Sequence, residues 1–165
     1  MAQNMGFGTW VDKLCKRKSR WIFKIDGVTD DGASALPPLK SARPSLTFKE
    51  IEAQHLNETV FFPSKPEWKP IQLTLFDVDG RENRVTDWIK QLYDAESGTY
   101  KPSCDGTFKK RCTLEMYNGC GEVIETWIFE NAWPQVVEWG ELDMADSNFV
   151  QIDITLRYDR AYRQG

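Results

Sequence analysis

The chain has 165 residues, 41% of them apolar and 28% charged, and a formal net charge of −4. These values are typical of a single globular domain with an ordinary core. No apolar run approaches the roughly 18 residues of a membrane span, and the N-terminus lacks the apolar stretch of a secretory signal. We therefore expect a protein that is made in a cytoplasm and has no membrane anchor.

Charge is distributed unevenly along the chain. Residues 1–50 hold nine Lys or Arg and five Asp or Glu, whereas residues 112–156 hold nine acidic residues and no Lys or Arg. A nucleic-acid-binding protein normally presents a basic surface, and the last third of this chain does the reverse. The acidic stretch is either a solvated face or one half of a self-complementary contact, in which basic N-terminal regions dock on acidic C-terminal regions of neighbouring copies.

The first 18 residues differ in pattern from the rest of the chain. Phe7, Trp10, Val11 and Leu14 recur at helical spacing in an otherwise polar stretch. So short a helix is marginal unless it packs on a partner. We therefore predict an N-terminal arm over 1–18 that docks on another surface, such as a second subunit, and a single domain over 19–165.

The first half of this domain reads as short strands separated by loops. Apolar residues alternate with polar ones in the last of these strands, where Ile71, Leu73 and Leu75 share one face. Proline-rich or small-residue stretches predict the loops. The predicted strands are 21–27, 46–51, 59–62 and 71–75, with loops over 29–41 and at Pro63, Pro66 and Pro70, and a bend over 55–58.

One clear helix is predicted over 83–94. Its apolar residues recur at helical spacing, and Gly98 follows where helices commonly end. The stripe consists of Val85, Trp88, Ile89, Leu92 and Tyr93. A loop over 97–106 is expected next.

The second half of the domain contains the strongest hairpin signal. The Asn118-Gly119 step predicts a two-residue turn between strands over 108–117 and 122–130. Trp133-Pro134 is expected to break the second strand, and a strongly alternating last strand covers 150–158. These elements together predict a mainly β protein, an antiparallel β-sandwich or partly open barrel with one flanking α-helix.

No catalytic or metal-binding pattern accompanies this fold. The single histidine, His55, has no nucleophile placed near it by a local signature, and a surface turn is the better interpretation. The four cysteines are Cys15, Cys104, Cys112 and Cys120, and their spacing matches no zinc module. We therefore predict no catalytic residues, no metal and no cofactor.

The cysteines are interpreted either as free thiols or as an inter-subunit disulfide. A two-residue turn would place Cys112 opposite Glu125, so Cys112 and Cys120 could not bridge across that hairpin. Free thiols are usual in a cytoplasm. If a disulfide forms between subunits outside the reducing cell, Cys15 and Cys104 are the pair that we would name.

Several short patterns, in order, are similar to those of a known family. They are Ala42 and Pro44, Asn57, Trp68, Ile71, Leu73 and Leu75, the run from Val85 to Trp88, the run from Glu130 to Pro134, and the run from Asp146 to Asn148. This order and spacing, over most of 19–160, resembles the tail tube proteins of contractile-tailed, myovirus-type bacteriophages.

The resemblance implies a structural virion protein and not an enzyme. Its fold would be tail tube-like, with strands that neighbouring subunits complete into an inner barrel. Hexameric rings would stack into the tail tube, the conduit through which DNA is ejected without specific binding. The implied partners are copies of itself, the tail sheath protein, and baseplate and tail terminator proteins, assembled in the host cytoplasm into the virion tail.

Large aromatic residues are the expected anchors of the contacts between subunits. Trp68, Trp133 and Trp139 flank predicted loops, and Trp10 lies in the arm, so we name these four tryptophans as interface candidates. Two alternatives within the resemblance are a baseplate tube-initiator and the tube protein of a related contractile injection system. A third alternative is a monomeric small β-barrel that binds a ligand or catalyses a reaction.

Overall fold

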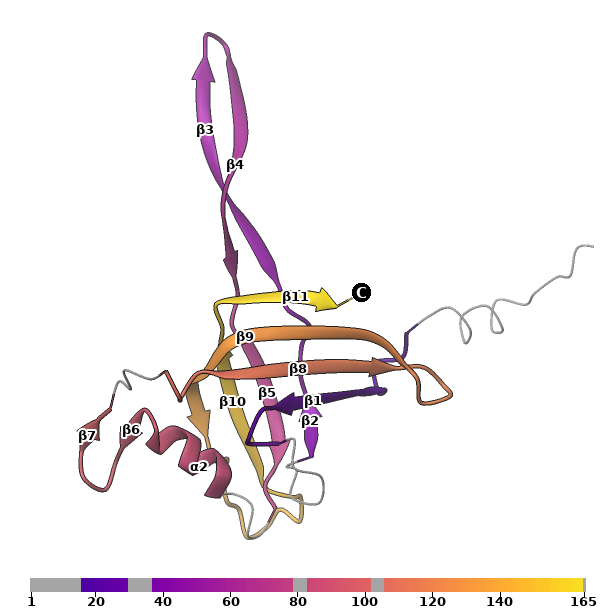
Figure 1. Cartoon of the computed structure of the whole chain (residues 1–165), viewed down its shortest axis with the longest axis vertical. Helices are drawn as coiled ribbons and strands as arrows, with labels where there is room; N and C mark the ends of the chain where they lie inside the picture. Colours follow the sequence, from indigo (N-terminus) through magenta and orange to yellow (C-terminus); the bar gives the residue numbers. More distant parts are fainter. Residues whose placement is uncertain (1–15, 30–36, 79–82, 102–105, 165) are drawn as a thin grey trace, which may run out of the picture.

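The structure is a computed structural model that describes residues 16–29, 37–78, 83–101 and 106–164. Within them it contains β1 (Trp21–Ile25), β2 (Pro38–Lys40), β3 (Leu46–His55), β4 (Glu58–Trp68), β5 (Ile71–Phe76), α2 (Asn83–Lys90), β6 (Tyr93–Asp94), β7 (Thr99–Tyr100), β8 (Lys110–Tyr117), β9 (Val123–Glu138), β10 (Gln151–Arg157) and β11 (Arg160–Gln164). The predicted class, mainly antiparallel β with one helix, is confirmed (Figure 1).

The body of the molecule consists of two antiparallel layers that share β9. The first half of β9 pairs with β8 on one side and with β11 on the other. Its second half pairs with β10, which continues through β5 to β2. One long strand therefore belongs to both layers, and the space between the layers holds the core.

The core is built from the alternating faces of these strands. In β10 the side chains of Ile152, Ile154 and Leu156 are fully buried, as the sequence pattern predicts. Phe129 of β9 packs against Phe23 of β1 and Tyr158, with ring centroids 5.7 and 5.0 Å apart. Each fully buried large side chain contributes about 1.5–3 kcal/mol relative to an exposed one, so this interior is the main source of stability.

Helix α2 covers one end of the core and is shorter than the sequence predicts. Val85 and Trp88 are buried, and the Trp88 Nε1–H donates a hydrogen bond to the Phe108 carbonyl at 2.7 Å. The helix ends at Lys90 because the following residues turn into the small β6–β7 hairpin, in which Gly98 adopts φ 65°. Residues 97–101, predicted as part of a loop, thus belong partly to β7.

Three further predictions about the strands are wrong. Residues 38–40 form β2 rather than loop, and a separate strand, β11, follows β10. Strand β9 runs through Trp133-Pro134 without a break. Pro134 is tolerated because it lies at a register shift between β9 and β10, where the ladder of hydrogen bonds is already interrupted.

The β8–β9 turn is wider than a two-residue turn. Tyr117 pairs with Val123, and the Asn118 side-chain oxygen accepts hydrogen bonds from the backbone N–H groups of Cys120 and Glu122. This side-chain capping favours a five-residue loop. Cys112 therefore lies opposite Phe129 rather than opposite Glu125.

Gly140 is required where the chain leaves β9. Its φ is 82°, and a Cβ atom there would lie 2.6 Å from the Gln151 carbonyl oxygen. We expect Gly140→Ala to lower the free energy of unfolding by about 2–4 kcal/mol, from backbone strain together with the clash. Urea denaturation of the purified variant measures this loss.

Gly121→Ala is the matched control for this substitution. Gly121 has φ 84°, but a Cβ atom there meets nothing within 4 Å. It should therefore lose only the strain, about 1 kcal/mol. Equal losses at both glycines would contradict the proposed clash with Gln151.

Candidate assembly surfaces

The β3–β4 hairpin projects from the body of the molecule. Its two strands pair only with each other among the described residues, and Figure 1 shows the ribbon extending well beyond the two layers. Nearly every residue of both strands is exposed. The exposed large apolar side chains of this hairpin are Leu46, Phe48, Ile51, Leu56, Val60, Phe61 and Phe62.

Most of these apolar side chains near the tip gather on one face of the ribbon. Ile51 lies opposite Phe62, and Ala53 lies opposite Val60. Directly opposed residues in an antiparallel pair share a face, and no core lies beneath this one. An exposed apolar face of this kind usually marks a contact with another molecule.

The hairpin is longer than the sequence predicts. Pro63 and Pro66 were expected to lie in a loop, but β4 continues through both to Trp68. A proline has no N–H to donate, which matters little in a two-stranded ribbon whose outer edges are free. The register shift between Phe48 and Glu50 also falls between the two prolines, at a point where pairing is irregular.

The tip of the hairpin has an unusual backbone conformation. Leu56 adopts φ 53°, a region that glycine and asparagine enter more easily than leucine. Its side chain is 93% exposed, so no intramolecular packing offsets this strain. His55 is exposed beside it, at the surface position that the sequence predicts.

The base of the hairpin is anchored in the core by aromatic rings. Trp68 is half-buried and packs against the core cluster. Its ring centroid lies 6.1 Å from that of Tyr158, which in turn contacts Phe129. The direction in which the hairpin leaves the body is therefore fixed by packing.

A buried carboxylate joins three separate segments of the chain. Glu125 of β9 is 4% exposed and forms an ion pair with Lys16. Its other oxygen lies 3.8 Å from Arg43 and accepts a hydrogen bond from the Trp127 indole N–H. Sequence reasoning missed this role, because a glutamate in the outgoing strand of a hairpin gives no sign that it points inward.

An open cleft of about 550 Å³ lies beside this carboxylate. Its charged lining is entirely basic, and its apolar lining comes from Trp21, Leu114 and Met116. The four basic residues are Lys16, Lys18, Lys40 and Arg43. Desolvation, Arg163 and Arg43 together lower the pKa of Lys16. We call this feature the basic cleft.

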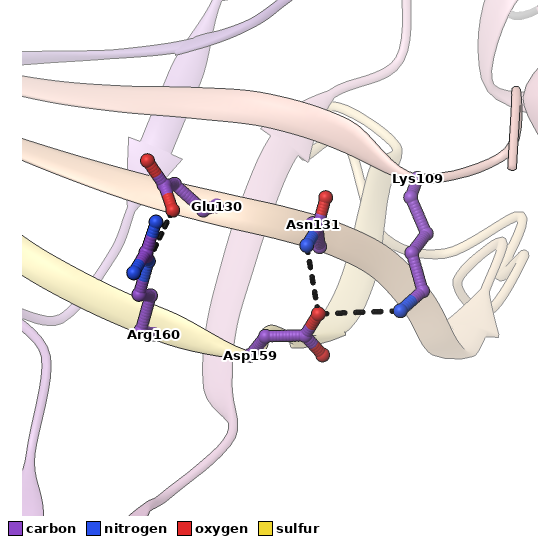
Figure 2. A network of polar contacts seen from close by, with 5 residues as sticks. All are labelled: Lys109, Glu130, Asn131, Asp159 and Arg160. Carbon is purple, nitrogen blue, oxygen red and sulfur yellow. Dashed lines mark hydrogen bonds and ion pairs between the residues drawn. The ribbon is translucent and has the colours of Figure 1, made fainter.

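A polar network fixes the point at which β9 passes from one layer to the other. Asn131 adopts φ 55°, and its side-chain N–H donates to the Asp159 carboxylate at 2.8 Å. Lys109 Nζ lies 3.2 Å from the same carboxylate, and Arg160 pairs with Glu130, as Figure 2 shows. These contacts tie β9 to the start of β11 and to the residue before β8.

The structure locates only some of the residues that the sequence singled out. Trp68 and Trp133 are half-buried and border one open pocket, and Trp139 is 50% exposed after β9. Trp10, Cys15 and Cys104 lie outside the described residues. The described residues do not bring these three tryptophans together into one site, and their role at an interface stays a prediction.

The two described cysteines have different surroundings. Both are free thiols, Cys112 buried and Cys120 exposed. Burial raises the pKa of the Cys112 thiol, which makes it unreactive. Among the described residues no three His, Cys, Asp or Glu side chains are grouped to hold a metal ion. No helix among them is long and apolar enough to cross a membrane.

Solved structures with the same fold come from contractile injection systems. One is a chain of the extended sheath–tube complex of the extracellular system PVC, with a TM-score of 0.73, 19% identity, and coverage of 96% of this chain and 97% of that chain. Another is a chain of the tube-terminating cap of the anti-feeding prophage, with a TM-score of 0.70, 20% identity, and 90% of each chain covered. These likenesses show that the chain shares its antiparallel β fold with both of these solved subunits.

Sequence comparison identifies the family. The pattern of the family described as T4-like virus tail tube protein gp19 matches residues 17–161. The tail tube protein of Serratia phage KSP90 is 29% identical over 103 residues, a region that spans 61% of this chain but only 58% of that relative. The chain belongs to the T4-like virus tail tube protein family.

Glu125 should contribute measurably to the stability of the subunit. Glu125→Gln removes the charge that pairs with Lys16 and Arg43, and we expect it to lower the free energy of unfolding by about 1–2 kcal/mol. Urea denaturation of the dilute protein provides the measurement. The exposed Glu96→Gln is the matched control, and a loss no larger than that of the control would contradict the assigned role.

The Glu115 carboxylate should make stability depend on acidity. Burial raises its pKa, but hydrogen bonds from Lys24 and Tyr117 outweigh burial and hold the pKa below its usual value of 4.5. A carboxyl group whose pKa is lower in the folded state stabilises the fold above the unfolded value, and this contribution is lost as pH falls through the folded value. As the pH is lowered stepwise below 4.5, the free energy of unfolding of the wild type should therefore fall more steeply than that of the Glu115→Gln variant. Parallel pH profiles would rule this out.

Proposed function

We propose that the chain forms hexameric rings that stack into the tube of a contractile phage tail, the conduit for DNA ejection. The single observation that carries this proposal is the apolar β3–β4 hairpin, which is anchored at its base and covered by nothing in the described part of the subunit. Membership of the family is the reason for proposing a tube. The hairpin offers an apolar face that a lone subunit does not use and that a neighbouring copy could contact.

Free strand edges point to the same kind of assembly. Among the described residues β1 pairs only with β8, and β11 pairs only with β9, so each has one unpaired edge. Open edges are an aggregation risk that natural proteins cover or close. In the proposed ring, strands of adjacent copies complete these sheets into one inner barrel.

In the proposed ring the hairpin of one copy docks on a different part of the next copy. A contact between unlike surfaces is head-to-tail, and it closes into a ring or continues as a helix rather than ending at a dimer. The tube requires both outcomes, closure within a ring and continuation between rings. This geometry supports an assembly made of many identical copies.

The lumen is proposed to pass DNA without holding it. A protein gains affinity for DNA chiefly by neutralising phosphates with Lys and Arg. The region 112–156 contains no such residue, so a wall built from it would repel phosphates. We further propose that the chain performs no chemistry and is assembled in the host cytoplasm into the virion tail.

The proposed partners are the sheath, the baseplate and the tail terminator. The solved chains with this fold come from a sheath–tube complex, a sheath–tube terminator and a baseplate. Trp10, Trp68, Trp133 and Trp139 are proposed as anchors at contacts between subunits. Where a disulfide joins subunits, Cys15 and Cys104 are proposed as its two residues. The arm over 1–18 and the domain over 19–165 are proposed as the two functional units.

A second candidate is a baseplate tube-initiator or the tube protein of a related contractile injection system. The observation that favours it is the likeness to chains of the baseplate and cap of the anti-feeding prophage. An initiator would need another protein to begin a tube and would not polymerise alone. A monomeric ligand-binding barrel would show no assembly and would bind a small molecule.

Negative-stain electron microscopy of the purified protein over a range of concentrations tests the proposal. We expect rings or tubes of one uniform width. A monomer at every concentration, confirmed by sedimentation, would contradict the tube, and rings that form only with a baseplate extract would favour the initiator. Ile51→Ser/Phe62→Ser, which disrupts the apolar face of the hairpin, should abolish assembly, whereas Tyr100→Ser, which removes a 68% exposed ring elsewhere, should not.

Leu56 provides a sharper test of the hairpin. Leu56→Gly relieves the strain of φ 53° and removes a side chain that packs on nothing within the subunit. We expect the hairpin to be at least as stable, while the protein concentration needed for tubes rises about tenfold from the loss of one apolar anchor. Pelleting assays measure that concentration, with the adjacent Asn57→Gly as control. Unchanged assembly of the Leu56 variant would remove the tip from the interface.

A further inference from the structure

The loop between β9 and β10 combines negative charge with exposed apolar groups. This loop, together with Glu138, the last residue of β9, is called the acidic loop. Its carboxylates are Glu138, Glu141, Asp143 and Asp146, all exposed. Between them Leu142 is 85% exposed and Met144 is fully exposed. These two large apolar side chains, each flanked by carboxylates, are not part of the core of this subunit.

The shape of the acidic loop is nevertheless defined. Gly140 turns the chain out of β9, where a side chain would clash with the Gln151 carbonyl. The Asp143 carboxylate accepts a hydrogen bond from the Ala145 N–H at 2.9 Å, and Asp146 accepts one from the Asn148 N–H at 3.0 Å. The loop therefore presents Leu142 and Met144 outward from a backbone that local hydrogen bonds hold.

The basic cleft has the complementary properties. Its four charged lining residues are all cationic, and in the part of the chain that the structure describes only the buried Glu125 pairs with two of them. Its apolar lining, from Trp21, Leu114 and Met116, would accept side chains the size of Leu or Met. Loop and cleft thus complement each other in two independent respects. Their charges are opposite in sign, and apolar side chains project from the loop and line the recess of the cleft.

We infer that the acidic loop of one copy docks in the basic cleft of a neighbouring copy. Among the described residues no ion pair joins the loop to the cleft within one chain: the cleft cations Lys16 and Arg43 pair with Glu125 instead. The occupant that fits is a second copy of this chain, because every copy presents both surfaces. This inference rests on the proposed tube, and it assigns one contact that links copies head to tail.

Cross-linking of mixed-isotope assemblies tests the contact directly. Equal amounts of unlabelled and 15N-labelled protein are assembled and treated with a carbodiimide, which joins a carboxylate to an amine in direct contact. We expect peptides that pair a labelled loop carboxylate, Glu141 or Asp143, with an unlabelled cleft lysine, Lys16 or Lys18, and the reverse. Cross-links from loop to cleft within single copies, or from the cleft to residues 1–15 of the same copy, would overturn the inference.

A charge exchange tests the energetics. Glu141→Lys and Lys18→Glu each place like charges together, and we expect each to raise the concentration needed for assembly about threefold to tenfold. The two together in one chain restore an opposite-charge pair and should bring that concentration back toward the wild-type value. The exposed Lys90→Glu on α2, which lies outside both surfaces, is the matched control.

The outcomes separate this inference from the proposed function. Because Glu141 and Lys18 are exposed and form no ion pair or side-chain hydrogen bond within the described residues, the melting temperature of each variant should equal that of the wild type. If the wild-type chain stays monomeric, both the proposed tube and this contact are contradicted. Normal tubes whose cross-links lie elsewhere, or charge variants no weaker than Lys90→Glu, sink this contact alone.

Discussion

The architecture depends on one strand that is shared between two layers. Strand β9 pairs with β8 and β11 along its first half and with β10 along its second half. The change of partner occurs at Asn131, whose positive φ is held by the hydrogen bond to Asp159. Because both layers are attached to the same backbone, the core between them forms at a fixed spacing. The aromatic contacts from Phe23 to Trp68 depend on that spacing, and so does the direction of the hairpin.

The subunit leaves three kinds of surface exposed. Among the described residues, the hairpin carries an apolar face with no core beneath it, β1 and β11 each have an open edge, and the acidic loop presents Leu142 and Met144 to solvent. A monomeric protein would gain nothing from these features and would risk aggregation through them. In the proposed tube each of them would meet another copy, so features that are costly in isolation would become contacts in the assembly.

The sequence predicts the interior of this protein better than its surfaces. Strands with one buried face, such as β5 and β10, alternate clearly, and the stripe from Val85 to Ile89 identifies the helix. The failures occur where pairing tolerates an unfavourable residue. Pro63, Pro66 and Pro134 read as breaks, but the structure places them in a two-stranded ribbon or at a register shift, where a missing N–H costs little. Glu125 was missed because burial depends on Lys16 and Arg43, which are distant in sequence. The interface tryptophans remain predictions, since a single chain does not show what covers them.

The hairpin has a consequence for the timing of assembly. A two-stranded ribbon without a core beneath it is only marginally stable in water. The segment therefore keeps much of its conformational entropy when the free subunit folds. The conformational entropy of the ribbon is lost when it docks on a neighbour. The first few copies would lose this entropy while forming few contacts, whereas a copy that joins an existing ring would dock on a surface that is already rigid. In the proposed tube, elongation from an existing ring would then be faster than spontaneous initiation, so the purified subunit would assemble only above a threshold concentration.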